Sequence, residues 1–315
     1  MKKQKMDNKL FITIAIPAYK ARFLNRAIES VLAQKYLHFE LLIVNDASPE
    51  DIHSIVRTYT DTRIKYFTNE CNNGGENVVD NWNKCLRLAQ GDYFVLMGDD
   101  DEMKDNYLSE FIKLINKYPD LDIYHCRSFI IDENSNPIRL TASWPEFESL
   151  YENIWHRINF LREQFISDFV YKTSTLKSNG GFLKLPLAWM SDDISSYIAI
   201  GDKGIAHTQE AVFCYRKNSL SISTSGNIEL KLRASKEGID WLHSFLKNRK
   251  ENNVNAIFLQ EIFSGLSEYR RRTNKLSIYN ARKNKKISLL LRLFFVRHKY
   301  IFSFKDYLEG VLGKI

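Results

Sequence analysis

The chain has 315 residues, 44% of them hydrophobic, and a formal net charge of +7 at pH 7 with a pI near 9.0. This length allows one large domain with an appended part, and the basic excess indicates an anionic partner such as a nucleotide or a lipid headgroup. The four cysteines show no CxxC pairing, which argues against a zinc site and for reduced thiols in a cytoplasmic protein.

Four short runs rich in β-branched and aromatic residues alternate with segments of helical spacing. The predicted strands cover residues 11–17, 39–46, 63–69 and 93–100. The predicted helices between them cover residues 21–34, 49–59 and 76–90, with Gly91 as the C-cap of the third. This alternation is typical of βα units that build a mostly parallel sheet.

Beyond residue 225 the pattern becomes helical and basic. We therefore predict an α/β domain over residues 1–225 and a helical region over residues 226–315. The apolar run at 287–296 is about half of the roughly 20 residues that a membrane span needs, so no transmembrane helix is predicted. Its neighbouring lysines and arginines fit a helix on an anionic membrane surface, or one packed on the domain. We favour the membrane surface, because basic and aromatic residues coincide there.

Polar groups lie at the C-terminal ends of three of the predicted strands. The first strand ends in Pro17, Ala18 and Tyr19, the second in a segment around Asp46, and the fourth in the aspartates at 99–101. Because ligands bind at the carboxyl ends of strands in open α/β sheets, these loops are predicted to face one crevice. The aspartates alone fit an acidic lead-in to the next helix, or a site for Mg²⁺ or Mn²⁺ completed by phosphates.

The order of IPAY, IVNDAS, NNGG and NWNKCLRLAQGDYFVLMGDDD resembles the inverting family-two glycosyltransferases of the bacterial surface-polysaccharide type. The resemblance covers roughly residues 11–225. It implies a GT-A fold: a Rossmann-like, mostly parallel central sheet flanked by helices, here with a C-terminal helical extension. It also implies transfer of a sugar from a nucleotide-diphosphate donor to a hydroxyl of a saccharide or lipid-linked acceptor.

The same resemblance assigns the donor site. The family's DXD motif falls on Asp99 and Asp101, which would hold Mn²⁺ or Mg²⁺ on the diphosphate. The other residues that it implies for nucleotide-sugar binding are Pro17, Ala18, Tyr19, Asp46, Asn73, Gly75, Asn83 and Asp100. Many relatives carry Ala-Arg-Asn where this chain reads Asn81-Trp82-Asn83, so an arginine contact from that helix is absent.

Asp192 and Asp193, at the start of a predicted helix, resemble the acidic pair on the acceptor side of the family. An inverting transfer needs a base for the acceptor hydroxyl, and the resemblance assigns that role to Asp193, with Asp192 as an orienting group. A structural alternative is a helix N-terminus capped by Ser191.

The segment FCYRKNSLSIST resembles the loop that closes over the diphosphate in the family, although the histidine that many relatives have there is missing. Arg216 is predicted to neutralise the diphosphate, with Ser219 or Ser221 donating hydrogen bonds. As a structural alternative, the cations of this segment are a solvated strand end.

Two other functions fit parts of this pattern. A sugar-phosphate nucleotidyltransferase shares an α/β sheet and a metal, but it needs a glycine-rich basic loop after the first strand, and IPAYKARF has no glycine. A non-catalytic sugar-binding or membrane-associated scaffold is the other alternative. No nucleic-acid partner is predicted, and the expected location is cytoplasmic, at the inner face of the membrane.

Overall fold

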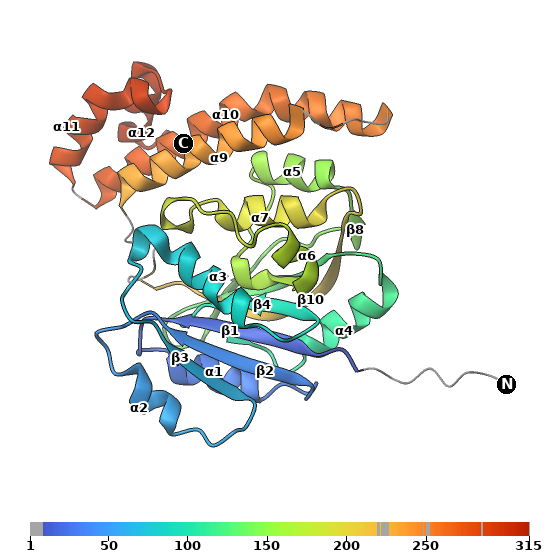
Figure 1. Cartoon of the computed structure of the whole chain (residues 1–315). Helices are drawn as coiled ribbons and strands as arrows, with labels where there is room; N and C mark the ends of the chain where they lie inside the picture. The colour runs from blue at the N-terminus through green and yellow to red at the C-terminus, as the bar shows by residue number, and fades with distance from the viewer. Residues whose placement is uncertain are drawn as a thin grey trace.

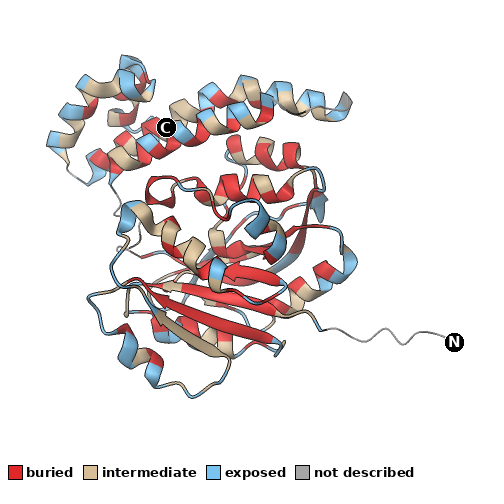
Figure 2. Ribbon diagram, in the orientation of Figure 1, coloured by how far each residue is buried: buried red, intermediate tan, exposed pale blue. Residues whose placement is uncertain are grey.

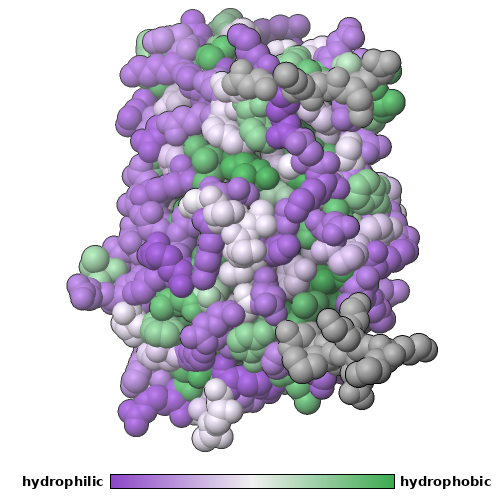
Figure 3. Space-filling model, turned by 45° about the vertical axis from the view of Figure 1, so that its right-hand side comes forward, coloured by the Kyte–Doolittle hydropathy of each residue, from purple (hydrophilic) through white to green (hydrophobic). Residues whose placement is uncertain are grey.

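The computed structural model describes residues 9–314 except 219, 220, 222–226, 248, 250–252 and 285. A sheet with helices on both faces forms one end of the molecule, and long C-terminal helices cover the other end (Figure 1). The face seen in Figure 3 mixes hydrophilic and hydrophobic side chains over its whole height.

The first half of the sheet is parallel, as predicted. Strands β1 (Ile12–Ala18), β2 (Phe39–Asn45), β3 (Ile64–Thr68) and β4 (Tyr93–Leu96) lie in the order β3-β2-β1-β4. All three pairings between them are parallel. The carboxyl ends of these strands therefore lie at one edge, where the sequence places its polar loops.

The second half of the sheet is mixed. Strand β9 (Phe169–Lys172) runs antiparallel between β4 and β6 (Ile123–Ile131), and β6 then pairs in parallel with β10 (Ile205–Arg216). Three short strands complete the edge: β5 (Glu102–Met103), β7 (Pro137–Leu140) and β8 (Phe147–Glu148).

Helices cover both faces of the sheet, because side chains alternate between the faces along each strand. On β1, Ile12, Ile14 and Ile16 pack with α1 (Leu24–Leu32), α2 (Ile52–Arg57) and α4 (Tyr107–Lys117). Ala15 instead faces the core with α3 (Val78–Leu88), α5 (Leu150–Ile158), α6 (Thr173–Ser178) and α7 (Ser191–Ile200). Figure 2 shows β1 and β2 as buried throughout most of their length.

Gly91 does not have the predicted capping role. The C-cap of α3 is Ala89, in extended backbone, and a Cβ on Gly91 would lie 2.5 Å from the backbone nitrogen of Thr13. Glycine is needed here because the chain passes directly against β1.

The C-terminal region is helical, as predicted. Helices α9 (Ile228–Lys247) and α10 (Asn253–Lys283) lie over α5 and α7 (Figure 1). Then come α11 (Ile287–Val296), the short η4 (Arg297–Tyr300) and α12 (Phe304–Leu312). The predicted boundary at residue 225 lies outside the described residues. Within the described part of the chain, every helix is too short or too polar to cross a membrane.

Candidate active site

Asp99 joins the loops that follow β1 and β4. Its Oδ2 accepts hydrogen bonds from the backbone nitrogens of Tyr19 and Lys20, both at 2.7 Å. The end of β1, at Pro17 and Ala18, thus lies beside the segment of residues 99–101, which we call the acidic loop. Tyr19 is 41% exposed. The structure therefore brings these two predicted loops together, as the parallel sheet requires.

Asp46 and Asn73 also meet, although they are far apart in the sequence. The side-chain nitrogens of Asn73 and Asn69 each donate to Asp46 Oδ1 at 2.6 Å. Asp46 is buried, and this bonding stabilises its carboxylate. The result is a cluster of bonded polar side chains between the end of β2 and the NNGG loop.

The NNGG loop reaches the segment that precedes α7. Gly75 opens the short η1 (Gly75–Asn77), and a Cβ on Gly75 would lie 3.7 Å from Leu187 Cδ2. Gly74, with φ +74°, is the residue here whose backbone conformation favours glycine. The predicted donor loop and the predicted acceptor segment are therefore neighbours.

The amide of Asn83, a predicted nucleotide-sugar contact, is bonded within the protein. Its Nδ2 donates to Phe182 O at 3.0 Å, and its Oδ1 accepts from Phe182 N at 2.8 Å, so both ends of the amide hold one turn. The next residue is Lys84. Its Nζ donates to Asn69 Oδ1 at 2.5 Å, and Asn69 in turn donates to Asp46.

The remaining aspartates of the acidic loop converge on Gly98. A Cβ there would lie 2.7 Å from Asp101 Oδ2 and 3.0 Å from Asp100 Oδ1, so glycine leaves room for both carboxylates. Removal from water and the neighbouring Asp100 charge raise the pKa of Asp101 well above its usual range. The same two causes raise the pKa of Asp99 to about 6.

The side chain of Arg216, which is predicted to neutralise the diphosphate, is bonded within the protein in this structure. Its side chain is fully buried: Nε donates to Asp100 O and Nη1 to Asp132 O, each at 2.7 Å. Nη2 pairs with Glu102, and the backbone nitrogen donates to Asp101 Oδ1 at 2.8 Å. Arg216 therefore stabilises the conformation of the acidic loop through its bonds to Asp100 and Asp101.

The loop after β10 continues this support. Asn218 Nδ2 donates to Asp100 Oδ2 at 2.7 Å, and Ser221 Oγ donates to Asn218 O at 3.4 Å. Ser219, the other predicted donor to the diphosphate, lies outside the described residues.

Asp192 and Asp193 have different surroundings at the start of α7. Arg157 Nε and Nη2 donate to the two oxygens of Asp193 at 2.8 and 3.2 Å, and Gln164 Nε2 adds a bond at 2.5 Å. The Asp193 carboxylate is thus buried and fully engaged. No motif in the sequence pointed to Arg157 or Gln164, since α5 and the loop after it meet α7 only in the folded chain.

Asp192 is partly buried and forms no ion pair within the described part of the structure. Removal from water raises the pKa of Asp192 to about 7, the charge of Asp193 adds to the rise, and Arg157 opposes it. A carboxyl group with this pKa can accept a proton near neutral pH.

The segment before Asp192 is strained. Leu187, Ala188 and Met190 have positive φ angles of 59°, 54° and 68°, a region that costs non-glycine residues free energy. Met190, not Ser191, is the N-cap of α7, and Ser191 Oγ instead accepts from Leu185 N at 3.1 Å. Gly238 of α9 packs against Met190, so the C-terminal helices support this strained turn.

No group of three or more His, Cys, Asp or Glu side chains is arranged as a metal site in the described part of the chain. A cation held by the acidic loop would need substrate or water oxygens to complete its shell, which is common for Mg²⁺.

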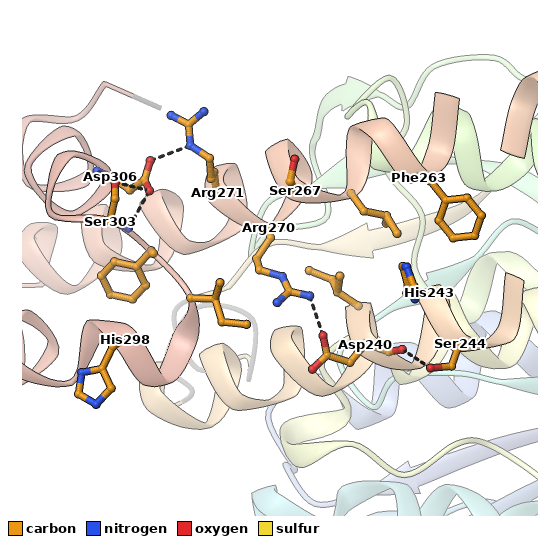
Figure 4. A pocket seen from close by; sticks show the side chains of 14 residues that line it. Asp240, His243, Ser244, Phe263, Ser267, Arg270, Arg271, His298, Ser303 and Asp306 are labelled. Atoms are coloured by element: carbon orange, nitrogen blue, oxygen red, sulfur yellow. Dashed lines mark hydrogen bonds and ion pairs between the residues drawn. The ribbon is translucent and has the colours of Figure 1, made fainter. Parts of the chain in front are cut away.

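A cavity of about 900 Å³ lies away from these loops, between α9, α10 and the segment 298–306 (Figure 4). Its arginines are paired within the protein. Arg270 donates to Asp240 at 2.7 Å and Arg271 to Asp306 at 2.8 Å. The cavity is therefore apart from the predicted catalytic residues and offers little net positive charge.

A sequence profile described as "Glycosyl transferase family 2" matches residues 13–176, just over half of the chain. The chain belongs to glycosyl transferase family 2. It is 39% identical over 110 residues to the putative colanic acid biosynthesis glycosyl transferase WcaA of Escherichia coli, covering 34% of this chain and 38% of that protein. It is 30% identical over 109 residues to the GalNAc(5)-diNAcBac-PP-undecaprenol beta-1,3-glucosyltransferase of Campylobacter jejuni, covering 34% and 35%. Each alignment thus spans well under half of the relative.

Two solved structures resemble this chain over 96% of its length. TarS 1–349 of S. aureus in complex with UDP-GlcNAc has a TM-score of 0.66 at 15% identity, covering 96% of this chain and 81% of that one. Mannosyltransferase PcManGT of Pyrobaculum calidifontis, with GDP-Man and Mn²⁺, has a TM-score of 0.56 at 15% identity, covering 96% and 86%. These likenesses confirm the predicted GT-A fold.

Proposed function

We propose that this chain transfers a sugar, with inversion, from a nucleotide-diphosphate donor to a hydroxyl of a saccharide or lipid-linked acceptor in surface-polysaccharide synthesis. The observation that carries the proposal is that the donor and acceptor segments are neighbours at one edge of the sheet, where Leu187 Cδ2 lies 3.7 Å from the position that a Cβ on Gly75 would take. Family membership favours this function over the nucleotidyltransferase alternative.

Asp192 is the better candidate for the base. In an inverting displacement the acceptor hydroxyl oxygen attacks the anomeric carbon, its proton moves to the base, and the bond to the diphosphate breaks on the opposite face. Asp193 holds Arg157 and Gln164, whereas Asp192 carries a carboxyl group with a pKa of about 7. We therefore propose that Asp192 is the base that accepts the proton of the acceptor hydroxyl. Asp193 stabilises the start of α7.

The acidic loop has the chemistry of a site for Mn²⁺ or Mg²⁺. Asp100 and Asp101 present hard oxygen donors that converge over Gly98, which suits either cation. Asp99, the other predicted ligand, gives one oxygen to the backbone of Tyr19 and Lys20. When bound, such a cation acts as a Lewis acid that stabilises the departing diphosphate.

The nucleotide would bind near the polar cluster of Asp46 and Asn73 and the exposed Tyr19. The Campylobacter relative is named for a PP-undecaprenol acceptor, which supports an acceptor of the lipid-linked class. We accordingly place the chain in the cytoplasm, at the inner face of the membrane.

Calorimetry with UDP, GDP and dTDP, each with and without Mn²⁺, tests the proposal. Metal-dependent binding of one nucleotide is expected, and it would identify the donor class. If none binds under either condition, the chain is a non-catalytic scaffold and the proposal is wrong.

A further inference from the structure

Helices α11 and α12 each expose a stripe of large apolar side chains. On α11, Ile287, Leu291 and Phe295 are 69%, 60% and 70% exposed. Because residues four apart lie on the same face of a helix, these three form one stripe, while Leu293 is buried on the other side. Figure 2 shows most of α11 outside the buried class.

The stripe on α12 has the same spacing. Phe304, Leu308 and Leu312 are 50%, 41% and 64% exposed, and Tyr307 is buried between the helices. The four-residue period again puts the three side chains on one face. Two successive helices thus present apolar faces to solvent.

The two stripes are joined into one surface. The ring of Phe294 lies 5.2 Å from that of Phe295 and 5.8 Å from that of Phe304, measured between centroids. Tyr307 Oη donates to Leu290 O at 3.0 Å, which fixes α12 against α11. We call this surface, made by the six exposed residues of the two stripes, the α11–α12 face.

Basic residues surround the α11–α12 face. The sequence from 282 to 314 contains nine Lys and Arg but only two acidic residues, Asp306 and Glu309. Asp306 is buried and bonded to Arg271, so it adds little negative charge to the surface. Lys299 and Lys305 are exposed.

The apolar stripes and the basic residues around them distinguish between two partners for this face, a second copy of the chain and an anionic lipid surface. A second copy of the chain would bring a basic rim against a basic rim, and like charges across an interface oppose association. An anionic lipid surface instead offers acyl chains to the apolar stripes and negative headgroups to the lysines. We propose that the α11–α12 face lies on an anionic membrane surface, with both helices in the plane of the interface.

The proposal deepens the membrane location given under the proposed function and depends on it only for its biological meaning. In Figure 1, α11 and α12 lie on the side of the molecule toward which β1 runs. A chain docked through this face would therefore hold its candidate catalytic edge near the membrane.

Co-sedimentation of the full chain with vesicles tests the proposal without donor or acceptor. We expect binding to vesicles of phosphatidylcholine with phosphatidylglycerol, and weaker binding to phosphatidylcholine alone or at high salt. The double variant Leu291→Gln, Phe295→Gln should lower the apparent affinity at least about tenfold.

The matched control is Val254→Gln, Ile257→Gln. These two residues are 65% and 66% exposed at the start of α10, so they match the tested pair in kind and exposure but lie on another surface. Circular dichroism checks that all variants are folded. Retained vesicle binding in the Leu291, Phe295 variant would overturn the proposal.

Sedimentation velocity tests the other possibility, that a second copy of the chain covers the α11–α12 face. If the wild-type chain ignores vesicles but self-associates, and the Leu291, Phe295 variant is monomeric, the face is an interface between copies and the proposal is wrong. Nucleotide binding, measured separately, should be unchanged in both variants, so failure here is distinguishable from failure of the proposed function.

Discussion

The chain places adjacent aspartates together twice, at residues 99–101 after β4 and at Asp192–Asp193 at the start of α7, and the two groups are held differently. In the strand-end loop every carboxylate accepts a hydrogen bond from the protein: Asp99 from the loop after β1, Asp100 from Asn218 and Asp101 from the backbone of Arg216. At the start of α7, the hydrogen bonds from Arg157 and Gln164 both go to the carboxylate of Asp193.

This difference shows what crowded carboxylates require. Repulsion among like charges must be relieved by nearby donors or by protonation. Burial raises the pKa of carboxyl groups in both places, at Asp99 and Asp101 as well as at Asp192. The difference is in the hydrogen bonds: donors shared over the loop fix its shape, whereas the donors at the start of α7 bind Asp193 and Asp192 forms no ion pair among the described residues. The first arrangement suits a binding site and the second suits proton transfer.

The largest effect is expected for Asp192→Asn. Loss of a general base costs roughly 10²–10⁴-fold in rate, so sugar transfer should fall by about 10³-fold in a steady-state assay, while nucleotide binding stays at the wild-type level. Asp202→Asn, at the exposed far end of α7, is the control. Wild-type turnover in Asp192→Asn would remove the distinction drawn between the two aspartates.

Asp101→Asn should weaken Mn²⁺-dependent nucleotide binding. Replacing an anionic oxygen donor by an amide should cost on the order of 100-fold in affinity, comparable to the larger effects seen around metal sites. Calorimetry with and without Mn²⁺ measures it, and Asp105→Asn, an exposed neighbour paired with Lys35, should bind normally. If Asp101→Asn binds metal and nucleotide as the wild type does, the strand-end loop has only a structural role.

Asp193→Asn should reduce stability more than Asp192→Asn. Removing one partner of a buried ion pair leaves Arg157 uncompensated, which costs about 3–5 kcal/mol. Denaturant unfolding monitored by circular dichroism should show this loss for Asp193→Asn. Equal stability of the two variants would contradict the structural role assigned to Asp193.

Arg216→Lys should disturb the conformation of the acidic loop, and its effect on nucleotide affinity should be smaller than that of Asp101→Asn. Lysine keeps the positive charge but cannot reach Asp100 O, Asp132 O and Glu102 together. Nucleotide binding in the presence of Mn²⁺ should drop by roughly tenfold, similar to the lower effects of lost supporting contacts. An unchanged affinity would show that the loop keeps its shape without the guanidinium.

The smallest effect is expected from pH near neutrality. A base with a pKa of about 7 is half protonated at that pH, so turnover should fall about twofold there and about tenfold for each further unit of acidification. The stability effect runs the other way. A carboxyl group with a raised pKa in the folded state favours folding at low pH and loses this contribution as the pH rises through about 7.

Measuring unfolding from pH 5 to pH 8 checks the sign. The wild type should lose stability relative to Asp192→Asn as the pH rises, because the variant lacks the titrating group. A flat difference between the two chains would show that Asp192 has an ordinary pKa.

The α/β pattern, the four parallel strands, the helical C-terminus and the position of both acidic groups could all be predicted from the sequence. These depend on hydrophobic periodicity and on local motifs, which short stretches of chain already contain. Gly91 was predicted as a helix C-cap, but the structure requires glycine there for another reason. The chain passes directly against β1, a segment almost eighty positions away.

Only the tertiary structure decided which side chains are free. Arg216 and Asn83 look like ligand contacts in the sequence, yet each is bonded within the protein by groups from distant segments. Arg157 and Gln164, which no motif indicates, decide between Asp192 and Asp193. The type of a residue limits the chemistry it can perform, but the neighbours that folding brings to it set its charge, its pKa and its freedom to bind.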